Sequence, residues 1–90
     1  MITINHTIVP AHDKEAAANW FAEIFGLEVA PPAGRFAPVI VNDGFSMDFD
    51  TRANFERQHY AFKLNDDEFE AVFARVKAKG LKYEIGRAHV

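Results

Sequence analysis

The sequence predicts an α+β domain that consists of one βαβββ module followed by the start of a second. Its 90 residues, 49% of them hydrophobic, suffice for one small domain and are too few for two. The two halves resemble each other at an offset of 53 residues, which pairs His6 with His59 and Trp20 with Phe73. In each half a strand-like segment precedes an amphipathic helix that ends at a glycine. An internal repeat of a strand–helix unit is therefore the main organising feature.

The first half begins with a predicted strand over residues 3–9, which is rich in β-branched side chains and is expected to stop at Pro10. A helix follows with Asp13 as its N-cap, because an aspartate oxygen can accept hydrogen bonds from the free amides of the first turn. The side chains expected to face the core follow the spacing i, i+3, i+4, i+7: Ala17, Trp20, Phe21 and Ile24. Gly26 is expected to end the helix, since glycine adopts the left-handed conformation without a Cβ penalty.

A hairpin completes the first module. Residues 31–34, Pro-Pro-Ala-Gly, predict a turn, and residues 36–41 predict an apolar strand. Asn-Asp-Gly at 42–44 favours a tight turn into a further strand over 45–51. Alternation along that last strand predicts an apolar face and a polar face, formed respectively by Phe45, Met47 and Phe49 and by Ser46, Asp48 and Asp50.

The second half repeats the beginning of the first. Residues 59–64 alternate between polar and apolar side chains and predict a strand. Either Asn65 or Asp66 is expected to cap the helix that follows, and Gly80 to end it before a short strand. The apolar stripe of this helix is Phe69, Val72, Phe73 and Val76. We expect helices on one face of curved, mostly antiparallel sheets.

The repeat also predicts the boundaries within the chain. Residues 1–56 are expected to form the first module and residues 57–84 the start of the second, within a single domain. The counterpart of Asp48 would fall at about position 101, past the last residue, so the second module is expected to be incomplete. Residues 85–90 match one translation of a common sequencing adapter, so we expect a non-native tail there and leave His89 out of the site.

Composition excludes several classes of function. Ten basic residues against thirteen acidic ones give a net charge of −3 with no basic block, so nucleic acid and anionic membranes are not expected partners. The chain has no cysteine, which excludes disulfides, thiolate zinc sites and a thiol nucleophile. It shows no signal peptide, and no apolar run approaches the ~20 residues that span a bilayer. We expect a cytoplasmic protein.

Three side chains of the kind that bind metals are candidates for a site. His6 and His59 occupy equivalent positions in equivalent predicted strands, and Asp48 lies on the polar side of the last strand of the first module. Two neutral imidazoles and a carboxylate suit zinc or another divalent first-row metal and leave coordination positions open. The alternatives are packed or exposed strand histidines, a solvated Asp48, and Asp50 in place of Asp48.

Three further polar residues are expected in solvated loops: His12, Arg52 and Arg57. His12 lies between a strand and a helix. The two arginines follow the last strand of the first module, where either could steer an anionic substrate, although a solvated position is the interpretation we favour.

Several segments together resemble the vicinal oxygen chelate superfamily, which includes glyoxalases, bleomycin-resistance proteins and extradiol dioxygenases. These segments are residues 4–13, the predicted helix with Trp20-Phe21, residues 24–27 at the end of that helix, and residues 58–62. The resemblance covers residues 2 to about 84. It implies the glyoxalase/bleomycin resistance/dihydroxybiphenyl dioxygenase-like fold, in which two βαβββ modules surround a metal-binding cleft.

The resemblance also implies a function. His6 and His59 match the family's two histidine ligands, and Asp48 matches a carboxylate ligand that is usually a glutamate, one methylene longer. The implied cofactor is a divalent metal (Zn, Ni, Mn or Fe), and the implied activity is that of a lyase, isomerase or dioxygenase on a small oxygenated molecule. The alternative is a metal-free protein of the bleomycin-resistance type that binds a small molecule. Missing strands would expose sheet edges, so we expect a homodimer.

Overall fold

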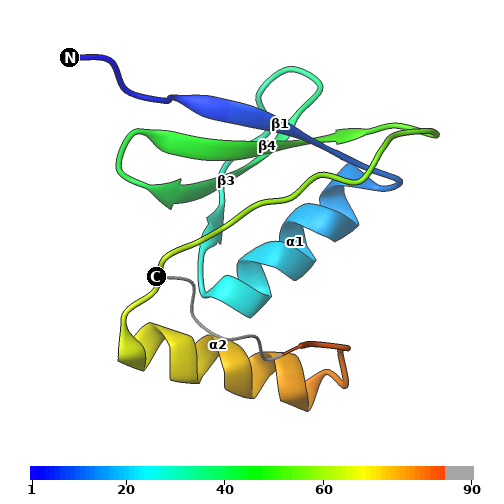
Figure 1. Ribbon diagram of the computed structural model, residues 1–90. Coiled ribbons are helices and arrows are strands. Elements are labelled where there is room, and N and C mark those ends of the chain that lie inside the picture. Colours follow the sequence, from blue (N-terminus) through cyan, green and yellow to red (C-terminus); the bar gives the residue numbers. More distant parts are fainter. Residues whose placement is uncertain (85–90) are drawn as a thin grey trace. The chain divides into compact units, whose positions relative to one another are not determined.

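The computed structural model describes residues 1–84 (Figure 1). The chain divides into two compact units, Met1–Tyr60 and a second unit that begins at Ala61, and each is described by itself. The elements, in chain order, are β1 (His6–Ala11), α1 (Lys14–Phe25), β2 (Glu28–Val29), β3 (Ala37–Asn42), β4 (Phe45–Thr51) and α2 (Asp66–Ala78). No helix within residues 1–84 is long and apolar enough to cross a membrane.

The first unit is a four-stranded sheet with α1 on one face, in the strand order β1-β4-β3-β2 (Figure 1). β1 pairs with β4 in parallel, and the two other pairings are antiparallel. β3 and β4 form the predicted hairpin, whose turn ends at Gly44 with φ of 81°. The predicted α+β class and βαβββ module are therefore confirmed.

The core of this unit lies between α1 and the sheet. Val39 and Met47 face each other across β3 and β4 and are the largest fully buried side chains. The rings of Phe21 and Phe49 lie 5.7 Å apart and join the helix to the sheet. Because these side chains occupy alternate positions of β4 and β3, they define the face of the sheet that α1 covers.

α1 begins and ends as predicted but is rotated relative to the predicted stripe. Asp13 Oδ1 accepts hydrogen bonds from the amides of Glu15 and Ala16, and Gly26 closes the helix with φ of 68°. Trp20, predicted to be buried, is 47% exposed. The buried residues are Ala18, Phe21, Ala22 and Ile24. Phe21 and Ile24 of the predicted stripe are therefore buried, but Ala18 and Ala22 complete the buried face in place of Trp20. Alanines occupy several faces of the helix, so the hydrophobic pattern does not fix its rotation.

β1 differs from its predicted bounds. It begins at His6 instead of Thr3, and it continues through Pro10 to Ala11. The proline was expected to end the strand because it has no amide hydrogen to donate. Within residues 1–84, β1 lies at the edge of the sheet and has a strand neighbour on one side only, and an edge strand tolerates a proline.

The second unit contains α2, which begins as predicted. Asn65 is its N-cap: its side chain accepts a hydrogen bond of 2.8 Å from the amide of Glu68, and its own amide donates to Glu68 Oε1 at 2.9 Å. This reciprocal pair is a capping box. None of the residues of α2 is buried; Val72, Phe73 and Val76 of the predicted stripe are half-buried, and Phe69 is exposed.

The predictions of two strands in the second half are wrong. Residues 59–64 form no strand, and neither do residues 81–84 after Gly80. A strand requires a neighbour for its amides and carbonyls, and within residues 1–84 neither segment has one. An alternating pattern gives a strand only where such a neighbour exists.

Candidate ligand-binding face of the sheet

The face of the sheet opposite α1, here called the distal face, carries the polar residues of β4. Met47 and Phe49 are buried in the core, so the residues that alternate with them point to the other side. The register extends this face across the neighbouring strands, because paired residues share a face. The residues on it are His6, Ile8 and Pro10 of β1; Ser46, Asp48 and Asp50 of β4; Pro38 and Ile40 of β3; and Glu28 of β2.

Two of the three predicted metal ligands lie on this face. His6 pairs with Ser46 and Ile8 pairs with Asp48, so His6 and Asp48 are diagonal neighbours on adjacent strands. Diagonal neighbours in a sheet are on the order of 7–8 Å apart. Asp48 is half-buried, and its Oδ1 accepts a 2.8 Å hydrogen bond from Ser46 Oγ. The carboxylate is therefore held in place on the distal face.

The imidazole of His6 is exposed, and its Nδ1 lies 2.7 Å from Asn5 Oδ1. An amide oxygen can only accept, so this contact requires a hydrogen on Nδ1. In the neutral ring Nε2 then keeps its lone pair. Nε2 is therefore the nitrogen that would bind a metal or accept a proton.

The third predicted ligand, His59, lies in the segment without a strand and is exposed. Within residues 1–84 no three histidine, cysteine, aspartate or glutamate side chains are placed to hold a metal ion together. The donor groups that this part of the chain assembles are His6 and Asp48. A divalent metal with three protein ligands would require one more donor.

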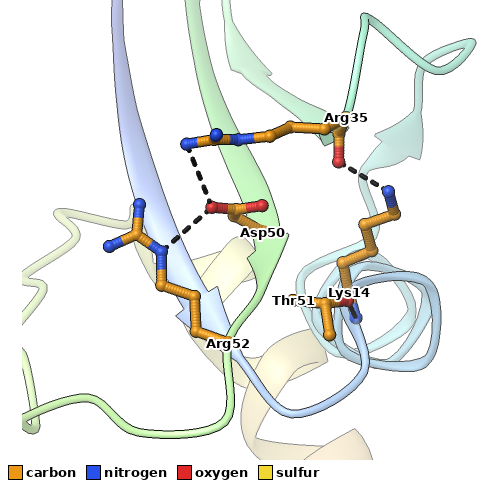
Figure 2. Close-up of polar contacts among 5 residues, drawn as sticks. All are labelled: Lys14, Arg35, Asp50, Thr51 and Arg52. Carbon is orange, nitrogen blue, oxygen red and sulfur yellow. Dashed lines mark hydrogen bonds and ion pairs between the residues drawn. The ribbon is translucent and has the colours of Figure 1, made fainter.

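A cluster of charged residues adjoins this pair at the end of β4 (Figure 2). Asp50 is the only buried charged residue within residues 1–84, with 6% of its surface exposed. Its Oδ2 accepts a 3.0 Å hydrogen bond from Arg52 Nε and forms a 3.5 Å ion pair with an Nη of Arg35. Arg52 lies exposed in the loop after β4, as expected, and it is also paired with a buried carboxylate, which was not expected. Asp50, the alternative to Asp48 as a metal ligand, is already paired with the guanidinium groups of Arg35 and Arg52.

Sequence reasoning missed Arg35. It lies in the turn before β3, next to Gly34, which has φ of 58°. The signal that could have indicated it is Asp50, an aspartate in a strand whose neighbouring residues are predicted to be buried. A buried carboxylate requires a cationic partner. Nothing in the local sequence indicates that this partner comes from a turn fifteen residues earlier, because the pairing of β3 with β4 brings them together.

The remaining sequence-predicted residues lie elsewhere. His12 is exposed as expected, and its ring contacts Phe55 at 4.9 Å. Arg57 is exposed in the segment after β4. Tyr60 has a pKa raised above the usual value of tyrosine, because partial burial penalises the charged phenolate. His89 lies outside the described residues.

Solved structures of similar fold identify the class of protein. The oxidase ChaP-H2 is 46% identical, with a TM-score of 0.83 over 88% of this chain and 63% of that protein. The oxidase ChaP-H1 is 40% identical, with a TM-score of 0.84 over 89% of this chain and 65% of that protein. A possible glyoxalase from Bacillus cereus shares the fold at 22% identity, with a TM-score of 0.69 over 89% of this chain and 76% of that protein.

No model of a protein family matches the chain, and no curated protein matches it either. The fold and its solved relatives nevertheless define an α+β protein of the βαβββ class. The chain has the fold of the vicinal oxygen chelate superfamily, which the resemblance of its sequence implied. It spans less than two thirds of the length of the two oxidases.

Proposed function

We propose that the protein is an enzyme of the oxidase or dioxygenase type that acts on a small oxygenated organic molecule at the distal face. The observation that carries this proposal is the identity of 46% and 40% to two proteins named as oxidases, over nearly nine tenths of the chain. An oxidase therefore has stronger support than a lyase or isomerase.

The proposed site contains a polar and an apolar part. His6 and Asp48 supply an imidazole and a fixed carboxylate, and Ile8 and Ile40 lie exposed on the same face. Exposed isoleucines beside polar groups suit a small organic ligand, since its apolar part is desolvated while the polar groups orient it. The carboxylate and the imidazole can accept or hold protons of the ligand's hydroxyl groups.

Metal dependence is part of the proposal. His6 and Asp48 would be two ligands of a divalent metal (Zn, Ni, Mn or Fe), and His59 would be the third. A bound divalent ion would supply Lewis-acid chemistry to two neighbouring substrate oxygens.

A metal titration tests this proposal. Calorimetry with Fe²⁺ under anaerobic conditions, and with Mn²⁺, Ni²⁺ and Zn²⁺, should show one site, which His6→Ala and Asp48→Ala each weaken at least tenfold. The matched controls are His12→Ala and Asp43→Ala, which remove the same groups from exposed positions away from the distal face. Absence of binding, or equal losses in the controls, would contradict the metal site. His59→Ala tests the third ligand separately.

A metal-free binding protein is the second candidate, and two observations favour it. Ile8 and Ile40 are exposed on the distal face, and no group of three metal-binding side chains is assembled within residues 1–84. This candidate predicts that a neutral apolar dye such as Nile red binds without metal and that Ile40→Lys abolishes the binding. A protein that binds metal at His6 and Asp48 but excludes the dye would favour the enzyme.

We further propose that a second copy of the chain is its partner. β1 is an edge strand, and the residues before it include Ile2 and Ile4, which are exposed. An exposed edge with apolar residues beside it favours pairing with another strand. Sedimentation equilibrium should show a dimer, and Ile4→Lys should shift the protein toward the monomer.

A further inference from the structure

We propose that Arg35 and Arg52, held by the buried Asp50, form a subsite for a carboxylate group of the substrate. This inference rests on the proposed function in one respect only, that a small oxygenated molecule binds the distal face. It names the chemical class of that molecule, an organic carboxylate.

The cluster lies on the same face as the candidate site. The hydroxyl of Thr51 accepts a 3.0 Å hydrogen bond from the amide of Lys14 at the start of α1, so the Thr51 side chain faces the helix. Asp50, its neighbour in β4, faces the other way (Figure 2). Asp48 and Asp50 are two residues apart on this side, a separation of about 6–7 Å along a strand. One small aromatic or aliphatic acid could reach both positions.

The contacts with Asp50 use only part of each guanidinium. An arginine has five N–H donors in a planar fork. Arg52 meets Asp50 through Nε and Arg35 through one Nη, both at Oδ2. The terminal nitrogens of Arg52 point away from Asp50 in Figure 2, and the side chains of Arg52 and Arg35 are 46% and 65% exposed. Planar donor forks that reach solvent match the two oxygens of a carboxylate.

Neighbouring contacts hold the cluster in place. Lys14 Nζ donates a 2.6 Å hydrogen bond to the backbone carbonyl of Arg35, which ties the turn before β3 to α1. The Arg35 guanidinium lies over the ring of Phe36, 5.1 Å from its centroid. Fixed donors lose less conformational entropy when a ligand binds than flexible ones.

The charges favour an anion. Lys14, Arg35 and Arg52 carry three positive charges and Asp50 one negative charge, so the cluster has a net charge of two positive in a chain whose net charge is −3. If Asp50 merely neutralised a buried site, one arginine would suffice. The second cation leaves a charge that a carboxylate of the substrate can neutralise.

Nuclear magnetic resonance on the unmutated protein with ¹⁵N-labelled arginine tests the proposal without metal. Benzoate should shift the Nε–H signals of Arg35 and Arg52 in a saturable manner, and isosteric, neutral benzamide should not. Arg57, exposed in the same unit and outside the cluster, provides the internal control. Inorganic phosphate forms a third arm: if it competes with benzoate at equal or lower concentration, the subsite is a general oxyanion site and the assignment to a carboxylate is wrong.

Substitutions separate binding from structural support. Arg52→Gln should weaken benzoate binding about tenfold, the effect expected when one charge-assisted hydrogen-bonding group is lost. Arg52→Lys keeps the charge beside Asp50 but loses the fork, so it should fold normally and still bind benzoate more weakly than the wild type. Arg57→Gln should bind as the wild type does.

The outcomes distinguish this inference from the proposed function. Benzoate shifts at Arg35 and Arg52 in a protein that binds no metal would leave the subsite standing and overturn the metal-dependent enzyme. Metal binding at His6 and Asp48 in a protein whose arginine signals do not respond to benzoate would overturn the subsite alone. Equal shifts at Arg57 would mean that benzoate binds any exposed arginine, and the subsite would be rejected.

Discussion

The two helices begin with similar local signals, but they differ in burial. Asp13 caps α1 and Asn65 caps α2, and both helices have acidic residues in the first turn. α1 has four buried residues, whereas α2 has none. The caps and the dipole account for where each helix begins. Burial against a sheet is what distinguishes α1, and it makes the first unit the one in which a large side-chain deletion should be costly.

The largest expected effect is the removal of a core side chain from the first unit. Met47→Ala should lower the free energy of unfolding by about 2–5 kcal/mol, because it removes a buried side chain and leaves a cavity. Phe69→Ala in α2 should cost less than about 1 kcal/mol, since that ring is exposed. Urea denaturation followed by circular dichroism measures both. Equal costs would mean that α2 is as well packed as α1, and the comparison between the helices would fail.

A smaller effect is expected from the buried carboxylate of the first unit. Asp50→Asn should cost about 1–3 kcal/mol, because the charge-assisted contacts with Arg35 and Arg52 are lost while the group remains buried. Asp66→Asn, at the exposed start of α2, should cost within about 0.5 kcal/mol. The same denaturation experiment at two salt concentrations measures these values. A neutral result for Asp50→Asn would mean that its partners stabilise the fold no more than an exposed pair does.

The two N-caps should have effects of similar size that appear in different measurements. Replacement of either cap by alanine removes about 1 kcal/mol of helix stability. For Asp13→Ala we expect a lower midpoint of unfolding of the whole first unit, because α1 is packed on the sheet. For Asn65→Ala we expect faster amide exchange over residues 66–78 and an unchanged midpoint. A lowered midpoint in Asn65→Ala would show that α2 unfolds together with the first unit.

The smallest expected effect concerns Tyr60, the last residue of the first unit. Burial raises its pKa in the folded protein, so its neutral phenol is favoured by folding. The resulting stabilisation is fully present below the unfolded pKa of about 10 and is lost as pH rises through the folded pKa. The difference in absorbance at alkaline pH between the wild type and Tyr60→Phe should titrate above the midpoint of a model tyrosine. A midpoint at or below that of the model compound would place the Tyr60 hydroxyl in water.

Much of the first unit could be predicted from its residues, because the relevant signals are local. Asp13 and Gly26 predicted the limits of α1, and the glycine at 44 predicted the hairpin between β3 and β4. The bounds of β4 were predicted correctly from its alternation, which also placed Asp48 on the face away from the core. Each of these features depends on the conformational preferences of a few consecutive residues.

The errors arose where distant residues decide the outcome. Trp20 is exposed because the side of α1 that lies against the sheet includes Ala18 and Ala22 beside Phe21, a rotation that the hydrophobic pattern does not specify. Pro10 lies within a strand because β1 is at the edge of the sheet. Residues 59–64 have the pattern of a strand but no neighbour within residues 1–84 with which to pair.

The sequence by itself determined the elements of the βαβββ module, the N-cap of α1, the start of α2 to within one residue, and the side of β4 on which the carboxylates lie. Short-range backbone preferences and the alternation of side chains suffice for these features. Only the tertiary structure decided that His6 and Asp48 are diagonal neighbours and that Asp50 is buried between Arg35 and Arg52. These contacts depend on strand order and register, which arise when separate segments bury their apolar faces together.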